Sequence, residues 1–446
     1  MFAPSNSWRT ICTAVFVAVV LLITATTYHL GLADDLLKAA PWTGDNYGDR
    51  PPPPPPSSTG INGEKAGHGG EIDQYCGAQH GQGPNSTTIE SPLVDPKVIG
   101  LVFYGRRELV RILDCYLKRN LRKNGGVLDE VVFAINTDDQ DDLAYLEDLL
   151  KTSPKYSKHV PQGEYDSHWW FGNWEAVSER DAVYVKIDDD VVFVEDDTIS
   201  TIVNRLVDNP QYFAVSANVV NNPALSWVHN RLGVYEPYWP EMKKPVAQPP
   251  HSWRASELPA YDGPATGPDG FDPAGSTPAP YQGHRWLPVR LWPGEAYNIT
   301  TAPASTLTYD PFGPSLHNWA AGAQTHYSFL HHLEQGDTYK YKFDTWDYLY
   351  ERLSINFLAL RGGDILDVFP FPQSDDEDYL TRVRSKELGR RVIVDGTGLA
   401  VHFAFGPQRK AHDGQGLAWT DALDRYGAYA DEKVCPFPKR AGTTVP

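Results

Sequence analysis

Three consecutive aspartates interrupt an apolar stretch near the middle of the sequence. Asp188, Asp189 and Asp190 follow VYVKI (183–187) and precede VVFV (191–194). Side chains two positions apart on an extended chain project to the same side, so Asp188 and Asp190 face one way. Carboxylates this close repel each other, and a hard divalent cation is their natural partner. The pattern predicts a metal site; the alternative is a solvated acidic loop, which the apolar flanks disfavour.

The elements that must position these aspartates alternate between apolar strands and amphipathic helices, which indicates an α/β domain with a mostly parallel sheet. In open sheets of this kind, ligands bind at the carboxyl ends of the strands, and Asp188 stands at such an end. We expect strands at 98–104, 131–135, 182–187, 212–220 and 399–405, and helices at 109–121, 143–150, 323–334 and 346–360.

Composition and charge bound the function. The 446 residues include 39 Lys and Arg against 57 Asp and Glu, a formal net charge of −18. Binding to nucleic acid needs clustered Lys and Arg to neutralise phosphates, so we expect no nucleic-acid partner. The hydrophobic content of 41% allows a large core and excludes a wholly disordered chain.

The amino-terminal residues predict attachment to a membrane. Positions 11–32 contain no Asp, Glu, Lys or Arg, and at about 1.5 Å per residue they can cross a hydrocarbon layer of about 30 Å. Arg9 precedes this segment and Asp34 and Asp35 follow it, so residues 1–10 are expected to stay in the cytosol. A cleaved signal peptide is the alternative. Both interpretations place the rest of the chain in the lumen or outside the cell.

Composition also divides the remaining chain. Residues 33–95 are rich in Pro and Gly, with six consecutive prolines at 51–56, which predicts an extended stem. Residues 96–434 form the expected catalytic domain, and 435–446 a short tail. Within the domain we expect 235–314, rich in Pro, Gly and aromatic residues, to be an insertion.

Four tryptophans are spread along that insertion, at Trp239, Trp253, Trp286 and Trp292. Exposed indoles are costly, so the segment is not expected to be merely disordered. Two interpretations remain open. The rings form an acceptor-binding loop on which sugars stack, or they form a cover over the edge of the sheet.

The cysteines predict one disulfide. Cys76 and Cys435 flank the folded domain and are expected to pair, whereas Cys115 lies in a helical pattern and is expected to be a buried free thiol. Cys12 lies in the expected membrane segment.

A strand that ends in Asp-x-Asp, placed after βα units and behind an anchor and a stem, resembles the nucleotide-sugar glycosyltransferases of the GT-A fold. The resemblance covers roughly 96–225 and 315–412. It implies a Rossmann-like, mostly parallel sheet flanked by helices, Mn²⁺ or Mg²⁺ as cofactor, a UDP- or GDP-linked sugar donor, and a glycan, glycoprotein or glycolipid acceptor. It also implies a single-pass type II enzyme of the Golgi or endoplasmic reticulum membrane, with a luminal catalytic domain.

The resemblance assigns the metal ligands. Asp190 would bind the ion directly, and Asp188 through water or through the ribose of the donor. Asp189, between them, would contribute to nucleotide-sugar binding. His402, on a strand late in the chain, resembles the third ligand of many such enzymes. A lone histidine is more often a structural residue, and that alternative stays open.

The resemblance also assigns groups that bind the donor. Tyr104 would stack on the base, Arg106 would reach a phosphate, and Asp138 would bind the nucleoside. Arg409 and Lys410 would meet the diphosphate. The alternatives are packing at a helix start, solvated arginines, and a helix N-cap at Asp138.

A catalytic base is needed if the reaction inverts the configuration of the sugar. Asp344, Asp347 and Glu351, around the expected helix start, resemble the acidic group that supplies the base, and the choice among them stays open. An ordinary helix with ion pairs is the alternative. The acidic tract at 375–378 has no apolar frame and is expected to be a solvated loop.

Two other functions remain open. Residues 188–192 also match the nucleophile motif of phosphatases of the haloacid dehalogenase type, with Asp188 as the nucleophile. That family places the motif on its first strand, whereas two βα units precede it here. The third function is that of a non-catalytic, glycan-binding relative.

Overall fold

The protein is described from a computed structural model. The chain divides into two units, 1–88 and 89–446. The structure describes residues 95–163, 169–246, 252–290, 299–313 and 317–435. The expected membrane segment, and the expected stem up to residue 94, lie outside these residues. Among the described residues, no helix is both long and apolar enough to cross a bilayer.

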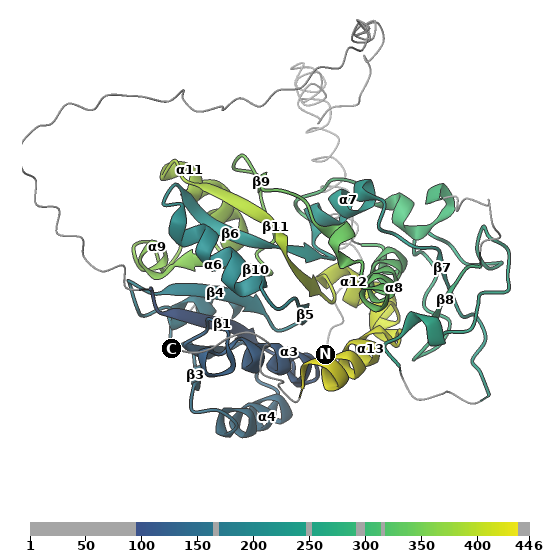
Figure 1. Cartoon of the computed structure of the whole chain (residues 1–446), viewed down its shortest axis with the longest axis horizontal. Helices are drawn as coiled ribbons and strands as arrows, with labels where there is room; N and C mark the ends of the chain where they lie inside the picture. Colours follow the sequence, from purple (N-terminus) through teal and green to yellow (C-terminus); the bar gives the residue numbers. More distant parts are fainter. Residues whose placement is uncertain (1–94, 164–168, 247–251, 291–298, 314–316, 436–446) are drawn as a thin grey trace, which may run out of the picture. The chain divides into compact units, whose positions relative to one another are not determined.

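The domain is built on one mixed sheet (Figure 1). Its strands are β1 (Val98–Tyr104), β2 (Glu130–Ile135), β3 (Tyr156–His159), β4 (Val183–Asp188), β5 (Val191–Val194), β6 (Tyr212–Val220), β9 (Trp346–Asp347), β10 (Phe357–Arg361) and β11 (Arg391–His402). The order is β3-β2-β1-β4-β10-β6-β11-β5, with β9 paired to β11.

Six of these strands run in one direction. β3, β2, β1 and β4 pair in parallel, and so do β6 and β11. Because β10 is antiparallel to both β4 and β6, β6 and β11 point the same way as β4. The carboxyl ends of β1, β2, β3, β4, β6 and β11 therefore lie at one edge of the sheet, the edge where open α/β sheets bind ligands.

Helices connect and cover the strands. The longer ones are α3 (Arg107–Asn120), α4 (Gln140–Lys151), α6 (Thr198–Asp208), α7 (Pro223–Leu232), α8 (Trp319–Gln335) and α13 (Ala422–Tyr429). The shorter ones are α5 (Trp169–Gly172), α9 (Gly362–Leu366), α10 (Asp376–Asp378), α11 (Ser385–Glu387) and α12 (Gly406–Lys410). α6 packs against β6 and β11, and Figure 1 shows α4 beside β3 and α13 beside β5 and α8.

The apolar runs explain the sheet. β1 is buried at all seven positions, and β4 is buried up to its last residue, Asp188, as expected of strands that are covered on both faces. The expected strands at 98–104, 131–135, 182–187 and 212–220 are confirmed to within a few residues. β11 begins earlier than expected, at Arg391, and ends at His402. The α/β class with a largely parallel sheet is thus confirmed.

The helix expected at 346–360 is wrong. Trp346–Asp347 forms an edge strand, and Phe357–Arg361 forms β10 in the middle of the sheet. Between them Leu349 and Tyr350 have φ angles of 50° and 66°, in a left-handed region through which a right-handed helix does not continue. Periodicity alone does not distinguish a short buried strand from a buried helix.

The insertion is internally packed. It contains a two-stranded ribbon, β7 (Tyr238–Pro240) and β8 (Trp286–Pro288), which Figure 1 shows beyond α8. Trp239 and Trp286 have no exposed surface, and Trp253 is 6% exposed. The ring of Trp286 meets that of Trp319 edge-on at 6.1 Å. These rings offer no face to a sugar, and the ribbon that carries two of them packs against α8. Trp292 lies outside the described residues.

The disulfide differs from the expected one. Cys115 of α3 pairs with Cys435, with 5.5 Å between the Cα atoms. The Cys76–Cys435 pair and the free thiol at Cys115 are therefore both wrong. The reason is tertiary, because α3 packs against the carboxyl-terminal segment Ala430–Val434.

A candidate metal centre at the carboxyl ends of the strands

The three expected metal ligands meet at the carboxyl edge of the sheet. β4 ends at Asp188, and Asp189 and Asp190 form the link to β5. β11 ends at His402, whose partner across the strand pair is Val191 of β5. The antiparallel pairing of β11 with β5 therefore carries His402 to the aspartate turn.

Asp188, Asp190 and His402 each offer one ligand atom, and these atoms lie within 4.8 Å of one another. Nε2 of His402 is 3.1 Å from Oδ1 of Asp190. Nδ1 of His402 is 3.2 Å from the carbonyl oxygen of Asn221. A carbonyl oxygen only accepts, so Nδ1 is assigned the proton and Nε2 faces the aspartates. Carbonyl groups orient metal-binding imidazoles in the same way.

The donor set fits a divalent cation. Oδ1 of Asp190 is buried, and despite its short distance to His402 it accepts no hydrogen bond of good geometry. A buried carboxylate oxygen without a donor is costly, and a cation would remove that cost. Ligand atoms of a six-coordinate ion lie about 3 Å apart when metal–oxygen distances are about 2.1 Å. The separation of the Asp190 and His402 ligand atoms is close to that value.

Arg106 balances part of this negative charge. From the loop after β1, its Nε donates to Asp189 at 3.1 Å and its guanidinium lies 2.9 Å from Oδ2 of Asp190. Burial raises the pKa of Asp189 to about 6 against the opposing effect of Arg106. Burial also acts to raise the pKa of Asp190, but when no ion is bound the positive charge of a protonated His402, together with Arg106, outweighs it and holds that pKa below its usual value. Arg106 thus binds the aspartates instead of projecting freely towards a phosphate.

Asp188 is held by a buried lysine that sequence analysis did not single out. Lys186 is 2% exposed, and its Nζ donates to Asp188 and, at 2.7 Å, to the carbonyl of Ile355. The same ammonium lies 4.8 Å from the ring centre of Phe103. Asn356 donates to Oδ2 of Asp188 at 3.0 Å. The sequence signal that could identify Lys186 is a lone lysine inside an apolar strand. A lysine is fully buried only when it is paired, so its position there indicates a buried partner.

A cavity of about 460 Å³ lies next to Asp188, and residues 374–377 form part of its wall. Asp376 is only 3% exposed, and the Glu377 side chain is 20% exposed. The expectation of a solvated loop at 375–378 is therefore wrong for these two residues. Their counter-charges come from distant segments, which a local sequence pattern does not show.

Asp376 and Glu377, which we call the second acidic cluster, are fully provided with partners. Nε1 of Trp174 donates to Asp376 at 2.7 Å. Oε1 of Glu377 accepts from the amide of Ile355 at 3.1 Å, and Oε2 pairs with Arg352 at 2.5 Å. Burial raises the pKa of Asp376 to about 6. These contacts fix one wall of the cavity.

The contacts of two expected donor-binding residues do not support the expected roles. Tyr104 is fully buried, and its hydroxyl donates to the carbonyl of Asp142 at 2.5 Å. Its ring therefore has no free face for a nucleotide base, and the stacking expectation is wrong. Asp138 is exposed. The N-cap of α4 is the next residue, Asp139, which accepts from two amides of the first turn.

Arg409 lies on the short helix that follows β11, and the structure brings it to the acidic cluster. Partial burial and the neighbouring Arg106 lower the pKa of Arg409, while Asp190 and Asp189 oppose this. Lys410 follows it and is exposed.

The structure does not bring the expected bases to the metal ligands. Asp347 lies on β9, which pairs with the amino end of β11, whereas His402 is at the carboxyl end. The backbone of Asp344 packs beside Gly396, within β11. Glu351 is exposed. The physical reason is that this segment forms an edge strand and a left-handed turn in place of the expected helix.

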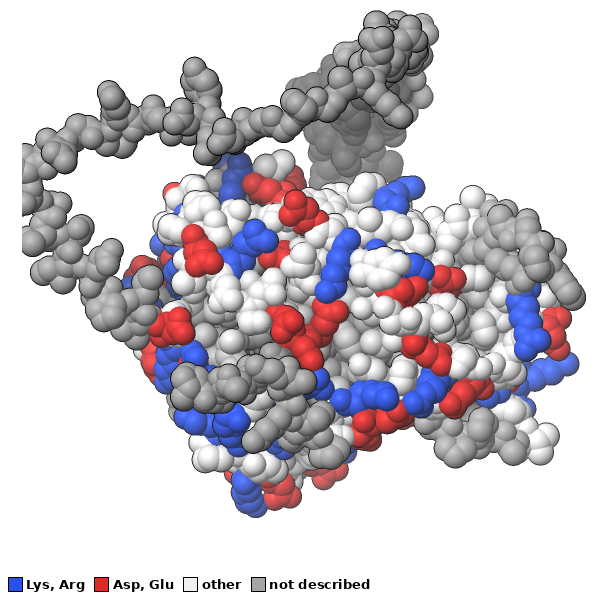
Figure 2. All heavy atoms as spheres, viewed as in Figure 1, with Lys and Arg blue, Asp and Glu red and all other residues white. Residues whose placement is uncertain are grey.

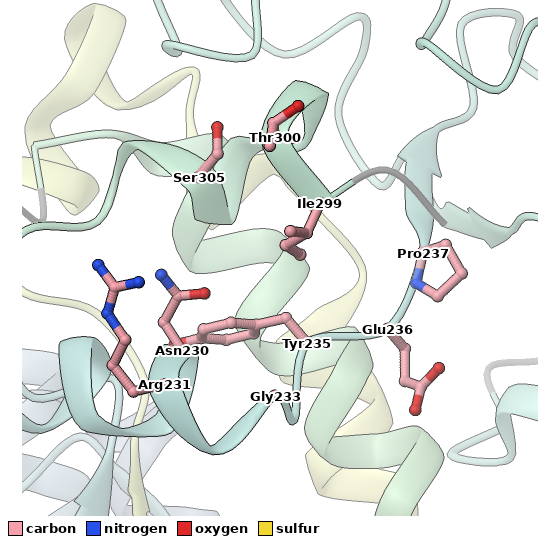
Figure 3. Close-up of a pocket in the computed structure, with 9 residues that line it drawn as sticks. All are labelled: Asn230, Arg231, Gly233, Tyr235, Glu236, Pro237, Ile299, Thr300 and Ser305. Carbon is pink, nitrogen blue, oxygen red and sulfur yellow. The ribbon is translucent and has the colours of Figure 1, made fainter. Parts of the chain in front are cut away.

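A larger cavity, of about 630 Å³, lies at the end of α7 and contains none of the metal ligands. Figure 3 shows the side chains of Asn230 and Arg231 projecting from α7 towards the segment that carries Ile299 and Ser305. The ring of Tyr235 lies beside Asn230, and the carboxylate of Glu236 points away from that ring.

Charge is distributed evenly over the face drawn in Figure 2, where acidic and basic side chains are interspersed.

No family model matches the chain, and no curated protein matches it. Among solved structures, GalNAc-T7 with UDP, GalNAc and Mn²⁺ is similar at 10% identity, covering 76% of this chain and 47% of that one, with a TM-score of 0.36. The mannosyltransferase PcManGT from Pyrobaculum calidifontis, with GDP-Man and Mn²⁺, is 21% identical over 29% of this chain and 37% of that one (TM-score 0.23).

A 4-diphosphocytidyl-2C-methyl-D-erythritol synthase is 9% identical over 29% of this chain and 62% of that one, with a TM-score of 0.22. The chain thus spans 37% to 62% of the lengths of these structures. Nucleotide-sugar glycosyltransferases solved with Mn²⁺ are among the structures that it resembles. Likenesses this distant carry no argument about function, which has to come from the site.

Proposed function

We propose that the chain is a metal-dependent glycosyltransferase that takes a sugar from a UDP- or GDP-linked donor and transfers it to a glycan, glycoprotein or glycolipid acceptor. The observation that carries the proposal is the convergence of Asp188, Asp190 and His402, with a buried Asp190 oxygen that lacks a hydrogen-bond donor. Mn²⁺ or Mg²⁺ bound there would stabilise the charge that develops on the diphosphate leaving group.

The chain's own residues supply the surroundings that such a donor needs. With a net charge of −18 the protein repels anions, so local cations decide whether a diphosphate binds. Arg409 lies near the cluster, whereas Arg106 is already paired with Asp189 and Asp190. The cavity of about 460 Å³ beside Asp188 is within the size range of sites for small ligands, about 300–1,000 Å³.

The direct test is a panel of UDP- and GDP-sugars incubated with the full-length protein in Mn²⁺, Mg²⁺ or EDTA, with release of free nucleotide as the readout. We expect at least one donor to be hydrolysed with metal, and release to stop in EDTA and in Asp190→Asn. Asp148→Asn, an exposed aspartate on α4, is the matched control.

Release that is equal in Asp190→Asn and in the wild type would contradict the proposal. A phosphoryl group trapped on Asp188 would favour the phosphatase. That family places its motif on the first strand, whereas in this chain the motif follows the fourth strand, β4. Glycan binding without turnover of any donor would favour the non-catalytic relative.

We further propose a single-pass type II protein of the Golgi or endoplasmic reticulum membrane, anchored by 11–32. The apolar segment supports the anchor, and the Cys115–Cys435 disulfide suits an oxidising compartment. Mass spectrometry of the mature protein should find residues 1–32 intact. A chain that begins near Thr27 would show a cleaved signal peptide instead.

A further inference from the structure

Four partly exposed aromatic rings lie on the surface between the two cavities. We call Phe312, Tyr309, Trp346 and Trp227 the aromatic row. Phe312 is 56% exposed and Tyr309 is 41% exposed, while Trp227 and Trp346 are half-buried. Exposed rings in contact with one another are unusual on a surface and mark places where something binds. They contrast with the tryptophans of the ribbon, which are buried.

One end of the aromatic row is the rim of the cavity beside Asp188. The guanidinium of Arg352 lies 5.4 Å from the ring centre of Phe312, and it donates to the carbonyl of Pro311 at 3.2 Å. The backbone at Gly313 is packed so closely on Phe405 that an added Cβ would lie 2.2 Å from that ring. Arg352 and Phe405 both line the cavity. Residues 309–313 therefore border its mouth.

The other end of the row is the larger cavity. Tyr309 stacks on Trp346, with ring centres 6.3 Å apart and 17° between the planes. Tyr309 also meets Trp227 edge-on at 5.9 Å. The guanidinium of Arg231 lies 5.3 Å from the ring centre of Trp227, and Arg231 lines the cavity of about 630 Å³ shown in Figure 3. Ring contacts thus join Tyr309 to the larger cavity, and the segment 309–313 joins Tyr309 along the chain to the mouth of the cavity beside Asp188.

We propose that the aromatic row binds a saccharide acceptor of several sugar units. Its reacting end enters the cavity beside Asp188, and its further units lie along the row towards the larger cavity. This inference rests on the proposed function and adds the acceptor class and its location. A pyranose ring has an apolar face of C–H groups and a rim of hydroxyls, which matches aromatic rings bordered by charged groups.

The position of the row favours a saccharide over a protein. The guanidinium of Arg352 lies over Phe312 and also lines the cavity beside Asp188, so a molecule bound to the row reaches the proposed transfer site. Under the proposed function the acceptor is the molecule that must reach that site. Its C–H faces match the exposed rings, and its hydroxyls match the guanidinium groups of Arg352 and Arg231.

The test is direct binding to the full-length protein in EDTA and without donor, so that it does not depend on the metal or on turnover. The probes are labelled gluco-, galacto-, xylo- and manno-oligosaccharides of one to six units. We expect at least one series to bind with an affinity that rises with length. Tyr309→Ala should weaken that binding about tenfold, because aromatic side chains are enriched among the residues that carry most of a binding energy. Phe312→Ala should act in the same direction.

Tyr339→Ala is the matched control, because Tyr339 is 66% exposed and lies outside the row; its binding should equal that of the wild type.

No binding by any series, or equal binding by Tyr309→Ala and the wild type, would overturn the inference. So would a dimer in light scattering that Tyr309→Ala converts to a monomer, because the row would then be a subunit interface. Metal-dependent hydrolysis without saccharide binding removes this inference alone. Saccharide binding that needs Tyr309, without turnover of any donor, keeps the saccharide site and removes the transferase.

Discussion

Two acidic clusters border the same cavity and differ in whether their oxygens are satisfied. In the second cluster, the oxygens of Asp376 and Glu377 accept hydrogen bonds from an indole, from backbone amides and from a guanidinium. In the first, Oδ1 of the buried Asp190 has no such donor and faces His402. Burial is common to both, so burial alone does not make a metal site. The unsatisfied oxygen is what sets the first cluster apart.

The difference arises from where each cluster sits. The aspartates stand where strands end and point away from the ladder, so backbone donors do not reach Asp190 Oδ1. The second cluster sits where two distant segments meet it, one carrying Trp174 and the other carrying Arg352 and Ile355. The first cluster is arranged to accept a cation, whereas the second fixes one wall of the cavity beside Asp188. The predictions below test that distinction, in order of their expected effect on metal affinity.

The largest effect is expected for Asp190→Asn. The change keeps the shape of the side chain but removes the charge that the ion needs. The Kd for Mn²⁺ should therefore rise on the order of 100-fold or more, which exceeds the loss of metal affinity expected when a residue that only contacts a ligand is removed. Isothermal titration of the nucleotide-free protein measures it. A rise of less than about threefold would mean that Asp190 is not a ligand.

A smaller loss is expected for His402→Gln. Two carboxylates remain, so Mn²⁺ affinity should fall roughly tenfold. The spectrum of free Mn²⁺ in electron paramagnetic resonance gives the bound fraction directly. His284→Gln, a buried histidine elsewhere in the domain, controls for general destabilisation. Equal affinities in the wild type and His402→Gln would make His402 a structural residue.

Glu377→Gln should separate the two clusters. It removes the closer of the two carboxylate partners of the partly buried Arg352 and leaves only Asp375, so the free energy of unfolding should fall by about 1–3 kcal/mol. The Kd for Mn²⁺ should stay within about threefold, because Glu377 offers no ligand atom to the three-residue metal centre. Urea unfolding and metal titration give the two quantities. A tenfold loss of metal affinity would place Glu377 in the metal site and end the comparison.

The smallest effect on the metal is expected for Cys115→Ala. The disulfide to Cys435 closes a separation of 320 residues, and its loss should lower the free energy of unfolding by about 2–4 kcal/mol. Metal affinity should not change, because the bridge joins α3 to the carboxyl-terminal segment. Reduction of the wild type should reproduce the shift. An unchanged unfolding midpoint would show that the two thiols are not paired.

Local patterns predicted the parts of the fold that depend on neighbours in the chain. The apolar runs of β1, β4 and β6 specify buried strands, and Asp188 and Asp190 follow from a buried strand that ends in acidic residues. β10 was mistaken for a helix because a short apolar run has no diagnostic period. Tyr104 was misjudged because the end of β1 is covered by packing, which the run does not show.

The sequence by itself determined the α/β class, the strand that presents the aspartates, and the acidic residues that suit a divalent cation. Only the tertiary structure decided which groups surround them. It placed Lys186 against Asp188, buried Asp376 against Trp174, and joined Cys115 to Cys435. The physical reason is that a strand or a cluster of carboxylates is specified by adjacent residues, whereas a counter-charge, a cavity wall or a disulfide partner is brought in by packing of segments far apart in the chain.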